Sequence, residues 1–331
     1  FEIMRSLLAR GVSIIFISHK LKEVREICDR VTVLRGGRVA GHADPKTYNE
    51  EMLAALMVGR EVILQVDKGD AHPGEAVLKI ENLVVNDDRD LLAVDHLNLE
   101  VYAGEILGIA GVQGNGQTEL VEAITGLRPI LSGTIHIGDL TFTHASPRRI
   151  TEAGVAHVPE DRQKNGMIAA FPVKDNMALQ QYYVEPFSSR LVANERVIQE
   201  HAERLVRMYD VRTPSVFTPI GKLSGGNQQK AIVAREFSRD CKLLIAAQPT
   251  RGLDVGSIEF IHKQIVRMRD SGTAVLLVSA ELDEILSLSD RVAVMYDGRI
   301  IDVLPIERAD RNTVGLLMAG VRPDGAKAQE T

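Results

Sequence analysis

Two patterns of apolar and polar positions, strict alternation and continuous apolar runs, occur along residues 76–320 of this 331-residue chain. Strict alternation predicts half-buried strands, which are 77–84, 97–101 and 134–137. Continuous apolar runs are typical of strands buried on both faces of a parallel sheet, and they are 106–110, 243–245 and 274–278. A helical pattern follows the first run at 119–124, and a polar, helix-prone region spans about 176–210. This order predicts an α/β fold with a separate helical subdomain in its middle.

The hydrophobic pattern near the N-terminus repeats near the C-terminus at an offset of 261 residues. Between 11–39 and 272–300, 10 of 29 positions are identical without a gap, and most others pair apolar with apolar. The chain also opens inside a helix-like pattern, with neither a start methionine nor a cap. We therefore expect the C-terminal remnant of a first domain, a polar linker, a complete second copy and a frayed tail. The predicted boundaries are 1–60, 61–75, 76–320 and 321–331.

The composition narrows the classes of protein to which this chain can belong. The length suits roughly two domains, and a hydrophobic content of 45% supports real cores. A net charge of −6 does not indicate a nucleic-acid surface. No run of about 18 or more apolar residues predicts a membrane span. The two cysteines, Cys28 and Cys241, do not form a disulfide framework, and they indicate buried, reduced thiols in a cytosolic protein.

A glycine-rich octet, 111–118, lies between a predicted strand and a predicted helix, where a phosphate-binding loop belongs. Its glycines let backbone N–H groups surround a triphosphate, and the hydroxyl of Thr118 suits Mg²⁺. The pattern requires lysine at position 117, but Gln117 brings no positive charge to the phosphates. Taken alone, the octet is equally consistent with a helix-capping glycine turn.

A second phosphate-type motif spans Leu223–Lys230. Ser224, Gly225 and Gly226 precede a helix-forming run at 231–236, which leaves backbone N–H groups free at a helix N-terminus. Alone, such a stretch could be an ordinary loop. Its spacing is informative, because it follows the octet by about 110 residues and precedes a third motif, 243–254, by some twenty residues.

The three motifs in series resemble those of ATP-binding cassette (ABC) ATPases, namely the P-loop, the signature, and the Walker B strand with its D-loop. The resemblance implies the P-loop nucleoside triphosphate hydrolase fold of the ABC type, with a RecA-like core, an antiparallel β subdomain and a helical subdomain. It implies ATP and Mg²⁺ as cofactors, with Thr118 as the metal ligand. The nucleotide-contacting residues that it implies are Gly111, Gly114, Asn115, Gly116, Gln117, Thr118, Glu160, Ser224, Gly225, Gly226, Gln228, Gln248 and Asp254.

The chain departs from the family pattern at the positions that take part in ATP hydrolysis. The Walker B aspartate and glutamate positions hold Ala247 and Gln248, the switch histidine position holds Ala280, and the Q-loop glutamine position holds Glu160. No aromatic residue for adenine stacking stands in 86–90. Phosphoryl transfer depends on charge neutralisation at the γ-phosphate. We therefore expect the P-loop at 111–118 to bind nucleotide weakly or statically and to hydrolyse little or none.

The first copy keeps the histidine that the second has lost, because His19 aligns with Ala280 in the repeat. A lone histidine after an apolar strand would more often be structural. In head-to-tail ABC pairs, the signature of one copy faces the P-loop of the other. The resemblance therefore assigns His19, as a catalytic residue, and 224–229 to one composite site, whose P-loop, Walker B strand and base would come from a first ABC domain upstream of Phe1.

Tandem chains with a degenerate second copy resemble the ATPases of sugar importers. The stretches 159–167, 246–254 and 279–282 are closer to nucleoside importers that work with basic-membrane-protein-like lipoproteins. This implies two membrane permease subunits docked near 160–176, an extracytoplasmic substrate-binding lipoprotein and a peripheral place on the cytoplasmic face of the plasma membrane. Two rival interpretations are a soluble twin-cassette protein acting on ribosomes or DNA, and a non-catalytic scaffold. The substrate itself, nucleoside or sugar, stays open.

Overall fold

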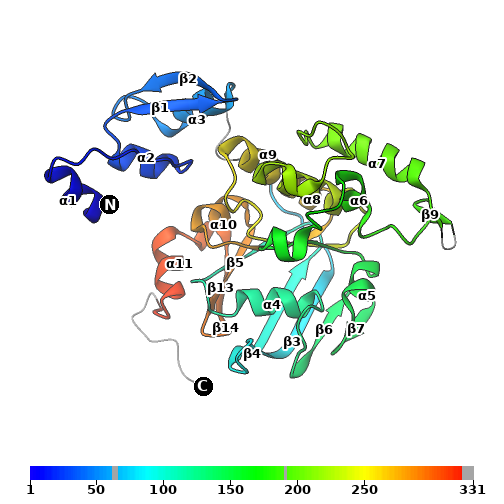
Figure 1. The fold of residues 1–331 in the computed structure, drawn as a ribbon. Coiled ribbons are helices and arrows are strands. Elements are labelled where there is room, and N and C mark those ends of the chain that lie inside the picture. The colour runs from blue at the N-terminus through cyan, green and yellow to red at the C-terminus, as the bar shows by residue number, and fades with distance from the viewer. Residues whose placement is uncertain (62–65, 190–191, 323–331) are drawn as a thin grey trace. The chain divides into compact units, whose positions relative to one another are not determined.

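The computed structural model describes residues 1–61, 66–189 and 192–322 (Figure 1). These form two compact units. The first unit is Phe1–Val66 with Gly252–Phe260, and the second unit is Asp67–Arg251 with Ile261–Thr331. Within the predicted linker, 62–65 lie outside the described residues, as do 323–331 of the predicted tail.

The first unit is a small α/β assembly. Its elements are α1 (Glu2–Ala9), α2 (Leu21–Ile27), β1 (Val31–Arg35), β2 (Arg38–Ala43) and α3 (Glu50–Val58). The two strands form an antiparallel hairpin. Helix α3 begins after Asn49, whose side chain accepts a hydrogen bond from the Met52 amide, and it ends at Gly59 in a left-handed conformation. The small core of this unit consists of Leu21, Ala43, Leu53, Ala54 and Val255.

The apolar stretch 12–17 is not the strand that its composition predicts. It has no regular secondary structure, and Ile15 and Ile17 are 94% and 92% exposed. A strand needs a neighbour to accept and donate its ladder hydrogen bonds. Within the described part of the first unit, the hairpin β1–β2 is the only sheet, and it does not include this stretch.

The second unit is built on a six-stranded sheet with the order β14-β13-β5-β12-β11-β8. The strands are β5 (Ile106–Ala110), β8 (Val155–Val158), β11 (Leu243–Ala247), β12 (Ala274–Val278), β13 (Arg291–Tyr296) and β14 (Arg299–Pro305). All neighbours pair in parallel except the edge strand β14. Every residue of β5, β11 and β12 is buried, which confirms the interpretation of the continuous apolar runs.

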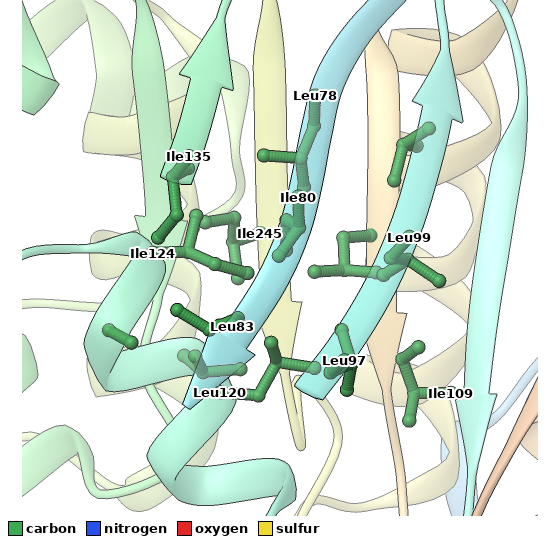
Figure 2. Packing of buried hydrophobic residues seen from close by; sticks show 14 of the residues in the cluster. Leu78, Ile80, Leu83, Leu97, Leu99, Ile109, Leu120, Ile124, Ile135 and Ile245 are labelled. Carbon is green, nitrogen blue, oxygen red and sulfur yellow. The ribbon is translucent and has the colours of Figure 1, made fainter. Parts of the chain in front are cut away.

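A four-stranded antiparallel sheet, in the order β4-β3-β6-β7, lies next to the main sheet. Its strands are β3 (Ala76–Asn86), β4 (Leu92–Tyr102), β6 (Ser132–Ile137) and β7 (Leu140–Phe142). Figure 2 shows inward-facing residues of this sheet packed against the main sheet and helix α4 (Gln117–Ile124). The residues labelled there from both sheets and α4 are Leu78, Ile80, Leu83, Leu97, Leu99, Ile109, Leu120, Ile124, Ile135 and Ile245. This shared core fixes the loop between β5 and α4.

The helix-prone region is discontinuous. It contains α6 (Val173–Ala178) and α7 (Glu195–Met208). The described residues between these helices are not helical, and they include Pro186 and the short pair β9 (Ser188–Ser189) and β10 (Val192–Ala193). Proline cannot donate the helical hydrogen bond, so a single helix over this region is excluded. Figure 1 shows α6 and α7 grouped with α8 (Gly225–Phe237), which is the predicted helical subdomain.

Of the remaining helices of the described chain, the first three precede strands of the main sheet and the last follows the edge strand β14. These helices are α5 (Pro147–Glu152), α9 (Val255–Asp270), α10 (Leu282–Leu288) and α11 (Arg311–Met318), with short turns η1 (Arg162–Gly166), η2 (Ile220–Lys222) and η3 (Ile306–Arg308). Helix α9 contributes its first residues to the first unit and the rest to the second. Over the described ranges, no helix is both long and apolar enough to cross a membrane.

Candidate nucleotide-binding site

The loop 111–116 leads from the buried strand β5 into α4. Gly114 and Gly116 have φ values of 96° and 100°, a region that favours glycine. A Cβ at Gly116 would lie 2.1 Å from the carbonyl oxygen of Ala93, and one at Gly111 would lie 2.7 Å from that of Met295. Two of the three glycines are therefore required by close packing of the backbone around the loop.

Asn115 anchors the same loop to the turn between β13 and β14. Its carbonyl oxygen accepts a hydrogen bond from the Gly298 amide at 3.1 Å, and its side-chain Oδ1 accepts one from the Asp297 amide at 3.2 Å. Asn115 thus fixes the loop to this turn. The first N–H groups of α4 have no acceptor within the helix.

Gln117 is buried and folds back onto its own loop. Its Nε2 donates to the carbonyl oxygen of Val112 at 3.1 Å. The side chain therefore braces the loop internally, and it adds no positive charge where a lysine would.

Thr118, the next residue, reaches a charged pair. Its Oγ1 lies 3.4 Å from Oε2 of Glu160, and Nη1 of Arg251 lies 2.6 Å from the other carboxylate oxygen of Glu160. Nη1 of Arg162 donates to the carbonyl oxygen of Arg251 at 3.3 Å. The sequence reasoning missed Arg251. The sequence feature that could have identified Arg251 is its place in the loop at the carboxyl end of a parallel strand, where ligands of α/β sheets bind.

The positions after β11 hold no carboxylate. Ala247 ends the strand, and Gln248 follows in a left-handed conformation with φ 48°. The Gln248 amide donates to the carbonyl of Val278, and its Oε1 accepts from the amide of Ala280 at 3.1 Å. Gln248 therefore ties the ends of β11 and β12 together, and this linkage offers no general base.

A buried hydrogen-bonded cluster joins Glu284 to His262 and Thr250 next to these loops. Nε2 of His262 and Oγ1 of Thr250 lie 2.8 Å and 2.7 Å from Oε1 of Glu284. Burial raises the pKa of Glu284, but hydrogen bonds from His262, Ser279 and Thr250 outweigh burial and hold the pKa below its ordinary value. Glu284 therefore stays ionised and links the loops that follow β11 and β12.

The signature forms the start of α8. Ser224 is exposed and precedes the first helical residue, Gly225, where a Cβ would lie 2.7 Å from Nη2 of Arg162. Oγ of Ser224 accepts a hydrogen bond from Nδ2 of Asn227. Gln228 is buried, and its side-chain Nε2 donates a hydrogen bond to the carbonyl oxygen of Leu223. Ser224, Gly225 and Gly226 thus lie at an accessible helix N-terminus, whereas Gln228 shapes the loop from inside.

Two predicted site residues belong to the first unit. His19 is exposed and lies just before α2. Asp254 binds the amide and hydroxyl of Ser257 at the start of α9. The P-loop, Glu160, Gln248 and the signature all belong to the second unit.

The residues near the loop suit a magnesium nucleotide in part. The glycine cradle and the start of α4 provide N–H donors, and Thr118 with Glu160 provides the hydroxyl and carboxylate oxygens that Mg²⁺ prefers. Among the described residues, no group of three or more His, Cys, Asp or Glu side chains is arranged to hold a metal ion by itself.

Residues 94–251 match the family model described as ABC transporter. The fold agrees with that match, since it is similar to the solved ATP-binding cassette MJ1267 of an ABC transporter (TM-score 0.61, 21% identity, 74% of this chain and 98% of that chain). It is also similar to the dimeric cassette MJ0796 (TM-score 0.60, 20% identity, 70% of this chain and all of the other). The chain therefore contains an ABC transporter ATP-binding domain, which has the α/β cassette fold expected from the sequence.

The chain is also similar to curated import proteins. The chain is 51% identical over 319 residues to the guanosine import ATP-binding protein NupO of Bacillus subtilis, covering 96% of this chain and 62% of the relative. It is 47% identical to the nucleoside import ATP-binding protein NupA of Lactococcus lactis, covering 96% of this chain and 63% of the relative. The glucose import ATP-binding protein TsgD13 of Haloferax volcanii follows at 45% identity, with 97% and 58% covered. The chain spans about 60% of the length of these relatives.

Proposed function

We propose that this chain is the ATP-binding part of an ABC importer for nucleosides or simple sugars. The names of the relatives support this proposal, since guanosine and nucleoside importers precede the glucose importer in identity. The chain would act at the cytoplasmic face of the membrane with two permease subunits and an extracytoplasmic substrate-binding lipoprotein.

Within this importer, residues 76–320 are a degenerate second copy. The observation that carries this proposal is the conformation of Gln117, whose amide is used inside the loop, beside an Ala247 and a Gln248 that offer neither metal ligand nor base. The glycine cradle and Thr118 hold ATP and Mg²⁺, and the cation neutralises phosphate charge when bound. Without a base, the bound nucleotide stays largely unhydrolysed.

Residues 1–60 are the C-terminal part of the first copy, followed by a linker at 61–75. The helices and strands support this assignment, because they repeat at the same offset of 261 residues as the sequence. Helix α2 (Leu21–Ile27) corresponds to α10 (Leu282–Leu288), and β1, β2 and α3 correspond to β13, β14 and α11 within one residue at nearly every end.

The signature at the start of α8 would then act in trans. Ser224, Gly225 and Gly226 serve the nucleotide held by the first copy, and His19 serves the same composite site. The exposed position of Ser224 and His19 in the structure is compatible with this role.

The proposal is tested by measuring ATP binding and turnover on this chain. We expect Mg²⁺-ATP to bind without turnover, and Gln117→Lys to raise the affinity by about tenfold, because it restores a charge-assisted contact. Ser224→Arg, which blocks the signature, should leave this binding unchanged. Turnover that survives repeated purification, or loss of binding in Ser224→Arg, would contradict the proposal. Co-purification of the chain with ribosomes rather than with permeases would contradict the importer assignment.

A further inference from the structure

Glu160 occupies a bridging position in the candidate site. One of its carboxylate oxygens lies 3.4 Å from Oγ1 of Thr118, and the other lies 2.6 Å from Nη1 of Arg251. The Glu160 side chain is 25% exposed and that of Arg251 is 61% exposed. Both charged groups therefore have room to change partners.

Each member of this ion pair has a charge that is missing at a motif position of the site. Gln117 provides no cation, and Ala247 provides no carboxylate. An ionised carboxylate beside the threonine hydroxyl disfavours a phosphate without a metal, because like charges repel. The same carboxylate favours Mg²⁺, which binds hard oxygen ligands together with phosphate oxygens. Arg251, in turn, has the planar guanidinium that suits phosphate.

We propose that the Glu160–Arg251 ion pair exchanges partners when a magnesium nucleotide binds. Glu160 joins Thr118 as a protein ligand of the cation, and Arg251 turns to the phosphates in place of the absent lysine. This inference rests on the proposed function of the loop as an ATP site. It predicts that ATP binding depends strongly on the divalent ion, because only the ion separates Glu160 from Arg251.

A purely structural role predicts a different outcome. Arg251 and Arg162 also join the loops after β8 and β11, so the pair could simply hold these loops together. In that case, removal of either charge loosens the same contact, and the two variants have the same effect on nucleotide binding with and without metal.

The experiment uses the whole chain and two binding readouts that do not depend on turnover. Dissociation constants for labelled ATP are measured by equilibrium dialysis with Mg²⁺ and with EDTA, and Mn²⁺ bound with ATP is measured by electron paramagnetic resonance. The variants are Glu160→Gln and Arg251→Gln. The control variants Asp139→Asn and Arg196→Gln make the same charge changes at exposed sites in the β6–β7 turn and on α7.

We expect Glu160→Gln to reduce the ratio of ATP affinities with and without Mg²⁺ by about tenfold or more, and to weaken the Mn²⁺ signal. Arg251→Gln should weaken ATP binding with Mg²⁺ and leave binding in EDTA nearly unchanged, because Arg251 stays paired with Glu160 when no ion is present. Glu160→Gln, in contrast, frees Arg251 and should strengthen binding in EDTA. Parallel effects of the two variants, or an unchanged ratio in Glu160→Gln, would overturn the exchange and leave the ATP site intact. Absence of ATP binding by the unmodified chain would instead overturn the proposed function and this inference together.

Discussion

The glycines of the P-loop show that residues of one sequence motif can have different environments in the structure. Gly111, Gly114 and Gly116 are equivalent in the sequence pattern. In the structure, Gly111 and Gly116 lie against backbone carbonyl oxygens, whereas a Cβ added at Gly114 would have no atom within 4 Å. The sequence identified all three glycines, but only tertiary contacts with Ala93 and Met295 distinguish them.

We expect Gly116→Ala to destabilise the second unit by about 3 kcal/mol or more, because strain at positive φ adds to a clash with the Ala93 carbonyl. Gly114→Ala has a similar φ without the clash and should cost only about 1–2 kcal/mol. Urea unfolding of both variants measures the difference. Equal losses would show that the close approach at Gly116 is not what requires glycine.

The side chains of the site likewise differ in what the sequence shows and what only the tertiary contacts show. The sequence locates the substitutions Gln117, Ala247 and Gln248 by their positions in the motifs. It could not show that Gln117 bonds to Val112 or that Gln248 bonds to Ala280. It also missed Arg251, since its contact with Glu160 joins residues 91 positions apart.

At the scale of elements, strand β8 and helix α8 are joined through buried charge. Glu236 on α8 pairs with Arg235 and Arg239 at 2.7 Å and 2.8 Å, and its Oε2 accepts from the amide of His157 on β8. Arg239 also donates to carbonyl oxygens of Thr151 and Val155. Burying this network is favourable only because each charge is paired.

The imidazole of His157 makes this junction sensitive to pH. Burial lowers the pKa of His157 to about 4, and within the described chain its Nε2 has no hydrogen-bond partner. An unfolded histidine has a pKa of about 6.5, so the unfolded chain binds the proton more readily between about pH 6.5 and 4. Stability from this residue is therefore complete above about pH 6.5 and falls as the pH is lowered through this range.

We expect the free energy of unfolding to fall by about 2 kcal/mol through His157 alone between about pH 7 and pH 5. His157→Gln should remove that part of the pH dependence, although it costs stability at neutral pH. His144→Gln, at an exposed loop position, is the control and should keep the full dependence. Urea midpoints across the range measure the effect, and an unchanged slope in His157→Gln would contradict the assignment. His201, whose pKa burial also lowers to about 4, should retain its own contribution.

At the scale of the whole molecule, the repeat places one apolar pattern in two environments. Residues 12–17 align with 273–278, yet β12 is buried between β5 and β11 while Ile15 and Ile17 are almost fully exposed. The repeat partners Ile15 and Leu276 make a direct comparison, because the local sequence is similar and only the neighbouring strands differ.

We expect Leu276→Lys to destabilise the second unit by about 4 kcal/mol or more, because it buries a charge in the parallel sheet. Ile15→Lys should change the stability of this chain by no more than about 0.5 kcal/mol. Thermal unfolding compares the two. A large loss in Ile15→Lys would mean that the stretch 12–17 is packed in solution, contrary to its exposure here.

The sequence by itself determined the α/β class, the buried strands at 106–110, 243–245 and 274–278, the repeat at 261 residues and the positions of the motifs. These are local properties, because hydrophobic period and motif spacing are written in neighbouring residues. Only the tertiary structure decided that 12–17 is not a strand, that Gln117 braces its own loop, and that Glu160 lies between Thr118 and Arg251. Each of these features depends on whether another segment of the described chain lies close enough to bond with the residue. The local sequence pattern does not show which segments come together.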